Sequence, residues 1–306
     1  MTMLRVTADD GVVLQAQVWP GEPGGPVVLG LHGLSANRLG FGPLRPYLPA
    51  GATLVSLDAR GRGLSDSPAD PSRYGMRRHA DDAAAVLRHL GLAEVVVVGH
   101  SMGAWVGLQL AAHHGDLVRG VVAVDGGWFA DLPAGVTPRA AVDAVMGAGW
   151  DVRLGATLPS AQVLLDAFQA HPAFVGIWSD ALAEHLLEGL DIAADGTATA
   201  RCTVLAATAD AVSYWDPVGQ RPTLREDLDL VRCPVTLVRA TAGFCVSPET
   251  MAPMMPEAAC AEFAAELPGL RVRTVEGTNH YSVGYGPSGA AAIGAEVATL
   301  AAVGAG

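Results

Sequence analysis

One serine in this sequence lies in a pattern that could make it a nucleophile. Ser101 is the centre of the segment Gly-His-Ser-Met-Gly at residues 99–103, which follows an apolar run and precedes a run with helical spacing. The glycines on both sides permit a sharp turn that holds the serine hydroxyl clear of the backbone, near the positive end of a helix. Ser101 is therefore predicted to attack an electrophilic carbon.

A serine hydroxyl attacks efficiently only when a base removes its proton, so a partner histidine is expected elsewhere in the chain. His280 is the predicted base, because it follows the short apolar run 272–275 and precedes the last predicted helix. This context places it on a loop at the carboxyl end of a strand, at the same edge as Ser101. Most other histidines lie in helical patterns, where a packed or solvated side chain is expected.

A carboxylate usually orients the imidazole of such a base. Asp125 ends the apolar run 118–124 and is followed by two glycines, which let the chain turn away from a sheet. We predict that Asp125 orients His280. Three alternatives remain at this point: Asp125 only caps a turn, Glu249 is the acid, or the site is a dyad without a carboxylate.

Acyl transfer also requires backbone N–H groups that hold the negative oxygen of the intermediate. One predicted donor is the amide of Met102, the residue after the nucleophile. The other is the amide of Leu34, in the turn that follows the apolar run 26–31. The neighbouring His32 is expected chiefly to brace this turn, and it is also included among the residues of the expected pocket.

The elements that must position these residues follow from the pattern of apolar residues. Short Val- and Leu-rich runs without strict alternation are typical of strands buried on both faces, and helical spacing separates several of them. An alternating hairpin is expected at residues 6–19, and an Ala-rich surface helix at residues 290–303. This order predicts an α/β fold with a doubly wound, mostly parallel sheet. The predicted parallel strands lie at residues 26–31, 53–57, 94–98, 118–124 and 235–239, and the helices between them at 79–90 and 102–114.

The alternation of strands and helices stops between residues 129 and 230. We predict that this segment is a helical lid without strands, inserted into a core made of residues 1–128 and 231–306. Aromatic residues in and around the lid should line an apolar pocket over the site. The predicted pocket residues are His32, Trp128, Trp178, Trp215 and Tyr281.

Bulk properties exclude several classes of function. The net charge of -12 argues against sequence-independent binding to nucleic acid, and no apolar run is long enough to span a bilayer. No metal-ligand cluster or dinucleotide-binding fingerprint is present, so we expect neither a metal nor an organic cofactor. The four cysteines form no CxxC pair and are expected as reduced thiols in a cytoplasmic protein, whose oligomeric state stays open.

Taken together, these motifs resemble the α/β-hydrolase family, and more closely its lidded bacterial members. The resemblance rests on His32-Gly33, on Asp-Ala-Arg-Gly-Arg-Gly-Leu-Ser at residues 58–65, on the turn at 99–103 and on Asn279-His280. It covers residues 26–127 and 231–300, and it implies an acyl-enzyme on the serine. The segment 58–65 is expected to be structural.

The chain departs from the family pattern at one place. Many members carry the acid after the seventh strand, but the corresponding residues 240–246 contain no carboxylate. They instead hold Cys245, which is expected to be a small packed residue, with a reactive thiol as the alternative. A minority of members place the acid after the sixth strand, at the position of Asp125.

The predicted function is hydrolysis of a carboxylic ester or lactone through an acyl-enzyme on Ser101, with a medium-sized, mostly apolar substrate. The serine argues against the family's epoxide hydrolases and dehalogenases, which use an aspartate at this position. Thioesterase, amidase, carbon–carbon bond hydrolase, acyl transferase and cyclase activities would use the same residues and stay open. A ligand-binding module that has lost turnover is the alternative outside enzymology.

Overall fold

The computed structural model describes residues 1–147, 149–215, 227–244 and 252–302. An eight-stranded sheet with the order β1-β2-β4-β3-β5-β6-β9-β10 forms its centre. The pairs β1–β2 and β2–β4 are antiparallel, and every other neighbouring pair is parallel. The strands are β1 (Thr2–Thr7), β2 (Val13–Trp19), β3 (Val27–Leu31), β4 (Thr53–Leu57), β5 (Val95–His100), β6 (Val118–Val124), β9 (Val235–Ala240) and β10 (Arg271–Val275).

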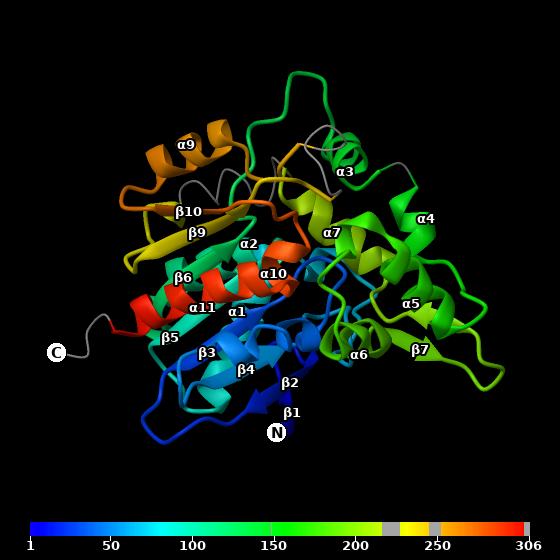
Figure 1. Ribbon diagram of the computed structural model, residues 1–306, viewed down its shortest axis with the longest axis horizontal. Helices are drawn as coiled ribbons and strands as arrows, with labels where there is room; N and C mark the ends of the chain where they lie inside the picture. The colour runs from blue at the N-terminus through cyan, green and yellow to red at the C-terminus, as the bar shows by residue number, and fades with distance from the viewer. Residues whose placement is uncertain (148, 216–226, 245–251, 303–306) are drawn as a thin grey trace.

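Helices cover both faces of this sheet, so the predicted doubly wound α/β architecture is confirmed (Figure 1). The helices α1 (Met76–His89), α2 (Met102–His113) and α9 (Glu257–Glu266) contribute to the core on one face, and α11 (Pro287–Ala302) covers the other. The short α10 (Ser282–Tyr285) precedes α11. Single 3-10 turns connect other elements: η1 (Arg38–Phe41), η2 (Arg45–Tyr47), η3 (Pro71–Arg73), η4 (Gly115–Leu117) and η5 (Pro172–Phe174).

The central strand β5 shows why the predicted strands lack alternation. Its residues 95–98 are four consecutive valines, and all six residues of the strand are buried. The side chains of Val95 and Val97 pack under α1 and α2, while those of Val96 and Val98 pack under α11. Since β3, β5, β6 and β9 run parallel, their carboxyl ends meet at one edge of the sheet.

The C-terminal helix is more buried than expected. Residues 290–303 were predicted to form a surface helix, but Ile293, Val297 and Leu300 of α11 pack against the sheet with exposed fractions of 2% or less. Its Glu296 is also buried, and the side chain forms an ion pair with Arg273 of β10. The small residues of this helix allow a close approach to the strands. None of the helices in the described ranges is long and apolar enough to cross a membrane.

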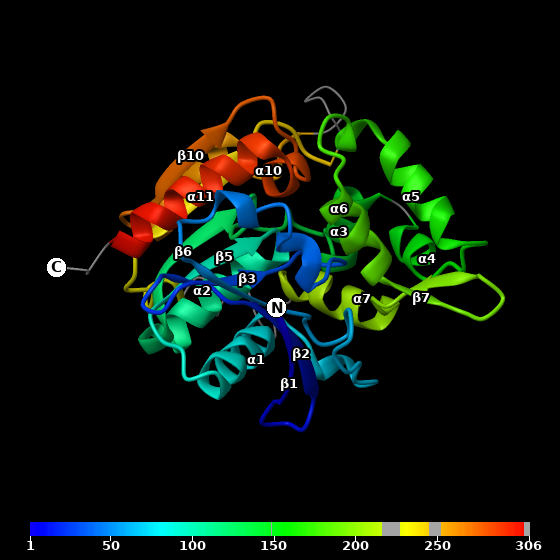
Figure 2. The same cartoon turned by 60° about the horizontal axis from the view of Figure 1, so that its bottom comes forward.

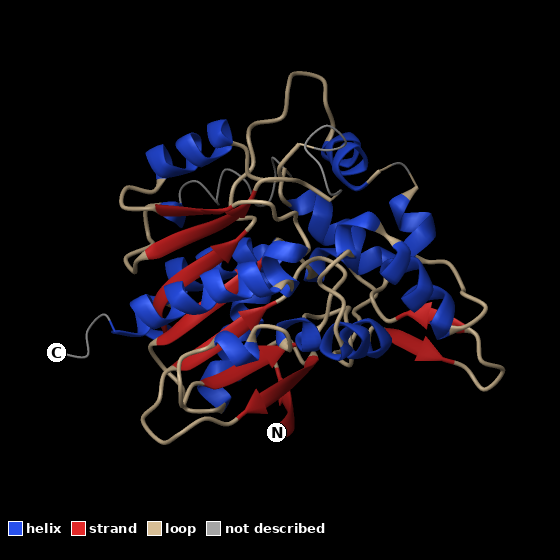
Figure 3. Cartoon of the chain, in the orientation of Figure 1, coloured by secondary structure: helices blue, strands red, loops and turns tan. Residues whose placement is uncertain are grey.

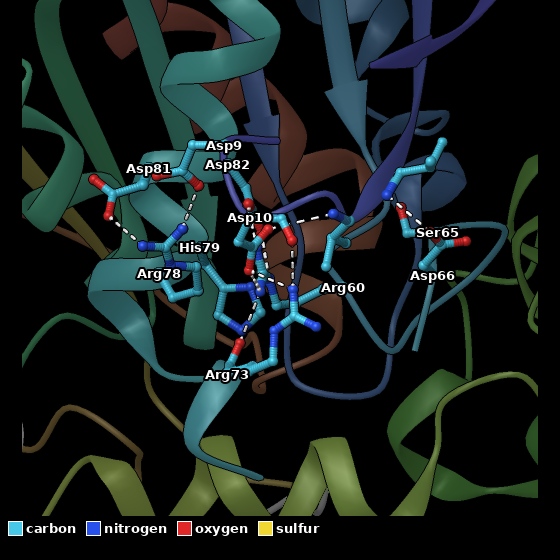
Figure 4. Close-up of polar contacts among 12 residues, drawn as sticks. Asp9, Asp10, Arg60, Ser65, Asp66, Arg73, Arg78, His79, Asp81 and Asp82 are labelled. Carbon is cyan, nitrogen blue, oxygen red and sulfur yellow. Dashed lines mark hydrogen bonds and ion pairs between the residues drawn. The ribbon is translucent and has the colours of Figure 1, made fainter. Parts of the chain in front are cut away.

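The N-terminal hairpin is tied to the body of the domain by buried ion pairs (Figure 4). Arg60, in the loop after β4, is fully buried and lies 2.6 Å from Asp82 of α1 and 2.8 Å from Asp10 in the hairpin turn. The hydroxyl of Ser65 accepts a hydrogen bond from the backbone N–H of Gln15 in β2, and this bond joins the same loop to the hairpin. A buried guanidinium is tolerated because these carboxylates pair with it, and removing one partner of such a pair costs about 3–5 kcal/mol.

The inserted segment, residues 129–230, lies between β6 and β9. Its helices gather beyond the end of the sheet to which the parallel strands point (Figures 1 and 2). They are α3 (Pro138–Met146), α4 (Trp150–Leu154), α5 (Ala161–Ala170), α6 (Asp180–Glu188) and α7 (Val204–Ser213).

The expectation that this segment contains no strand is wrong. The strands β7 (Leu190–Ile192) and β8 (Ala198–Ala200) form a separate antiparallel pair, visible in Figure 3 apart from the main sheet. Each strand has only three residues, so neither produces a hydrophobic period that can be read from the sequence. The tight turn between them contains Gly196 at a φ of +87°, a conformation that glycine adopts without strain.

A buried histidine joins the inserted segment to the core. The ring Nδ1 of His185 in α6 lies 2.9 Å from Asn37 Oδ1, and Asn37 Nδ2 donates to the carbonyl of His185. Asn37 is 2% exposed and His185 is 5% exposed. Burial lowers the pKa of His185 from 6.5 to about 4, so the ring is neutral in the folded protein at pH 7.

We expect this histidine to make stability fall in acid. Its pKa is lower in the folded chain than in the unfolded chain, so the unfolded state binds the extra proton, and stability present above pH 6.5 is lost as pH falls toward 4. Relative to His185→Gln, the native protein should lose about 2 kcal/mol more unfolding free energy between pH 7.5 and pH 5. Urea unfolding at both pH values measures this, and parallel losses in the two proteins would contradict it.

Candidate active site

Ser101 lies on a strained turn between β5 and α2. Its backbone φ is +53° and ψ is -119°, a combination that non-glycine residues rarely adopt. The flanking glycines make this turn possible, because a Cβ at Gly99 would lie 2.1 Å from the carbonyl oxygen of Gly103, and one at Gly103 would lie 1.9 Å from that of Leu31. The turn therefore packs directly against the end of β3 with no room for side chains.

The loop after β10 brings His280 against Asp125. His280 Nδ1 lies 2.7 Å from Asp125 Oδ2, and the two residues are 2% and 0% exposed. Because an ionised carboxylate can only accept hydrogen bonds, the imidazole proton belongs on Nδ1, which leaves Nε2 free to act as a base. The structure thus brings together the two residues that the sequence proposed as base and acid.

Backbone contacts hold this carboxylate in place. The amide of Ala240, at the end of β9, donates to Asp125 Oδ1 over 3.0 Å, and the amide of Asp125 donates to the carbonyl of Val238. Asp125 itself has a φ of +47°, a left-handed value that aspartate tolerates better than most side chains.

The neighbour of the serine holds the histidine loop. His100 is buried, and its Nε2 lies 2.9 Å from the carbonyl oxygen of His280. Burial lowers the pKa of His100 to about 3, so the neutral ring donates from Nε2. Within the described ranges no hydrogen bond joins the Ser101 hydroxyl to His280, and such contacts commonly tighten when substrate binds.

The two amides proposed as oxyanion donors have no acceptor among the residues that the structure describes. Met102 opens α2, where the first N–H groups lack partners within the helix. The Leu34 N–H belongs to the peptide between Gly33 and Leu34, and His32 holds this peptide in place. His32 Nδ1 lies 2.7 Å from the carbonyl oxygen of Gly33, and the amide of Ala59 donates to His32 Nε2. Burial lowers the pKa of His32 to about 3, so the ring stays neutral and carries its proton on Nδ1.

The brace sets the direction of the Leu34 amide. In a planar trans peptide the carbonyl oxygen and the following N–H point to opposite sides. Since His32 holds the Gly33 carbonyl, the N–H of Leu34 must point away from the His32 ring. His32 therefore braces the turn, as expected, by its hydrogen bond to the carbonyl of Gly33.

An apolar cavity opens beside Ser101. It is enclosed mainly by aromatic rings in mutual contact, with Trp105 and Phe129 stacked at 4.6 Å and Phe129 and Trp215 at 4.5 Å between centroids. The described lining is Leu34, Ser101, Trp105, Phe129, Val142, Val145, Met146, Ala211, Tyr214, Trp215, Phe244 and Met254.

The predicted pocket residues fall into two groups. Trp215 lines the cavity, whereas His32 braces the turn and Trp128 stacks on Phe263. Trp178 and Tyr281 pack into a satellite cluster around Phe174 and Leu182. None of these four residues belongs to the described lining of this cavity, so their place in a substrate pocket stays a prediction. The sequence shows that an aromatic residue will be buried, but not which partners surround its ring.

Several cavity residues were not predicted. Trp105 lies in the first turn of α2, directly after the Ser101 turn, and this closeness in sequence was a usable signal. Tyr214 adjoins the predicted Trp215, while Phe244 approaches the His280 ring with 4.6 Å between centroids. Phe244 belongs to the loop that lacks a carboxylate. The other residues predicted near that loop, Cys245 and Glu249, lie outside the described residues.

The described residues contain no group of three or more His, Cys, Asp or Glu side chains placed to hold a metal ion. The side chains of Asp125 and His280 instead form a hydrogen-bonded pair at the site. Such a pair can hold and move one proton beside the serine hydroxyl. That is the chemistry of acyl transfer by a serine nucleophile.

Comparison with known proteins gives a family and several relatives. A family model described as the alpha/beta hydrolase fold matches residues 26–287. A 2-(acetamidomethylene)succinate hydrolase of Mesorhizobium japonicum is 42% identical over 101 residues, 33% of this chain and 36% of that protein. The magnesium-chelatase 30 kDa subunit of Rhodobacter capsulatus is 38% identical over 91 residues, 30% of this chain and 32% of that protein. The aligned parts thus span about a third of the length of these curated relatives.

Solved structures match over nearly the whole chain. The crystal structure of an E-2-(acetamidomethylene)succinate hydrolase is similar with a TM-score of 0.75 and 26% identity, covering 97% of this chain and 98% of that one.

Proposed function

The chain belongs to the alpha/beta hydrolase fold family, as its motifs predicted. We propose that it is a serine hydrolase that cleaves a carboxylic ester or lactone through an acyl-enzyme. The hydrogen bond between Asp125 and His280, buried beside Ser101, is the observation that carries this proposal. Relatives named as hydrolases support the reaction class.

In the proposed mechanism Ser101 Oγ attacks the acyl carbon while its proton passes to His280 Nε2. The electron pair of the carbonyl moves to oxygen, which the N–H groups of Leu34 and Met102 stabilise. Collapse of this intermediate breaks the bond to the leaving group, which takes the proton from His280. Water then repeats the sequence on the acyl-enzyme and releases the acid, while Asp125 keeps His280 oriented and stabilises the imidazolium.

We propose that the substrate places a neutral, mostly apolar acyl group in this cavity. The relative from Mesorhizobium japonicum is named for a succinate, a dicarboxylate, but no Lys or Arg is found among the described residues that line the cavity here. Burying a carboxylate among aromatic rings without a cation is costly. Tyr214 also lines the cavity, and burial holds the pKa of its hydroxyl well above 10, so it adds no charge there.

The inserted segment is proposed to act as a lid over this cavity. It supplies Met146, Ala211 and Tyr214 to the lining, and its helices lie beyond the carboxyl ends of the strands. Rings from the segment and from α2 would exclude water around the acyl group.

The free thiols of Cys202, Cys233 and Cys260 support a cytoplasmic location.

The nucleophile is tested with a fluorophosphonate probe and p-nitrophenyl esters. The native chain should gain one probe mass and hydrolyse an ester, and Ser101→Ala should lose both while keeping its melting temperature, because the probe and the ester require the same hydroxyl. Intact mass and initial rate are the measurements. A native chain that neither reacts with the probe nor hydrolyses any ester would favour the silent ligand-binding module.

The substrate class is tested with two esters of equal length, p-nitrophenyl hexanoate and the p-nitrophenyl monoester of adipic acid. The neutral ester should have a kcat/KM at least about a hundredfold higher, because the second ester must bury a carboxylate in an apolar cavity. Trp215→Ala should raise KM for the hexanoate. Trp178→Ala is the matched control, since Trp178 packs in the satellite cluster. Equal kcat/KM values for the two esters would refute an apolar acyl site.

A further inference from the structure

Arg62 belongs to the segment 58–65, to which the proposed mechanism assigns no role. Its side chain is fully buried. The guanidinium donates from Nε to the carbonyl oxygen of Leu34 over 2.8 Å, and from Nη1 to the carbonyl oxygen of Arg60 over 3.0 Å. Nη1 also lies 2.5 Å from Asp210 Oδ2. One side chain therefore links the turn that carries the Leu34 amide to a carboxylate of the inserted segment.

Asp210 is the partner that makes this burial possible. It lies on α7 and is 0% exposed, and its Oδ1 accepts the amide of Gly75 over 2.7 Å. His79 Nε2 lies 2.9 Å from Oδ2. Burial opposes ionisation of Asp210, but His79 and Arg62 outweigh it and lower the pKa of the carboxyl to about 2. The carboxylate is thus anionic, and it binds Nη1 of Arg62 while Nε binds the carbonyl of Leu34.

Leu34 is consequently fixed by two successive carbonyl groups. His32 holds the carbonyl of Gly33, which sets the plane of the peptide that carries the Leu34 N–H. Arg62 holds the carbonyl of Leu34 itself, which sets the plane of the next peptide. Two hydrogen-bonded planes restrict rotation about the Leu34 backbone. The first hold comes from the core, while the second depends on Asp210 in the inserted segment.

We propose that Arg62 and Asp210 form a positioning pair that holds the Leu34 amide toward the developing oxyanion and so makes turnover depend on the docking of α7. This inference rests on the proposed function, since it takes Leu34 as an oxyanion donor. Neither side chain touches the reacting atoms. Their effect passes through the Leu34 peptide, and it should therefore be larger for the tetrahedral intermediate than for bound substrate.

The chain offers a matched control in Arg60 and Asp82. Arg60 lies two residues before Arg62 and is also fully buried, and it pairs with Asp82 over 2.6 Å (Figure 4). The other contacts of its side chain are Asp10 and the carbonyl of Arg73, which tie down the hairpin and do not include the turn at Leu34. Breaking either pair leaves a buried guanidinium without a carboxylate. Only one of the two pairs reaches Leu34.

The experiment compares Asp210→Asn with Asp82→Asn in the full chain. For each variant, kcat and KM are measured on p-nitrophenyl hexanoate, together with the affinity for hexylboronic acid, which forms a tetrahedral adduct with the serine, and for hexanoic acid, a ground-state ligand. Asp210→Asn should lower kcat and boronate affinity by the same factor, about tenfold to a hundredfold, with KM and hexanoate affinity within about twofold. Asp82→Asn should lower the melting temperature and leave boronate affinity unchanged.

A second variant covers the case in which Asp210→Asn does not fold. Arg62→Lys keeps the charge beside Asp210 but loses the planar fork that reaches Leu34 and Asp210 together, so it should show the same loss of boronate affinity. Unchanged boronate affinity in the folded variants, or an equal loss for boronate and hexanoate, would overturn the positioning role. A native chain that does not bind the boronate at all would instead overturn the proposed function.

Discussion

The buried hydrogen bond between Asp125 and His280 sets the requirements that the rest of the site meets. It needs a carboxylate at the end of β6 and an imidazole on the loop after β10, although β9 separates these strands in the sheet. The amide of Ala240 spans the gap by donating to Asp125, and a parallel sheet provides this because its strands end at one edge. The end of β9 therefore supports the acid of the neighbouring strand β6.

The other side of the site depends on groups that never face the substrate. His32 and Arg62 hold successive carbonyls of the turn at Leu34, and His100 holds the carbonyl of His280. All three side chains are buried, so water does not compete for these contacts. The inserted segment has two effects in the same region, because it supplies rings to the cavity and supplies Asp210 to the buried network.

The sequence predicts those parts of the fold and site in which one local pattern determines the outcome. The valines of β5 predict a strand buried on both faces, and glycines beside Ser101 and Asp125 predict turns at the edge of the sheet. It does not predict packing between distant segments. Trp128 and Trp215 are equally buried, at 5% and 8% exposed, yet only Trp215 belongs to the described cavity lining. The pairing of Arg62 with Asp210, 148 residues away, leaves no local pattern either.

The turnover of Asp125→Asn tests the central claim most directly. Asparagine keeps the size of the side chain but cannot hold the His280 tautomer or stabilise the imidazolium. On p-nitrophenyl hexanoate, kcat should fall by about a thousandfold or more with KM little changed, while the melting temperature shows that the chain is folded. A folded Asp125→Asn protein with a kcat near that of the native chain would contradict the claim that Asp125 orients the catalytic base.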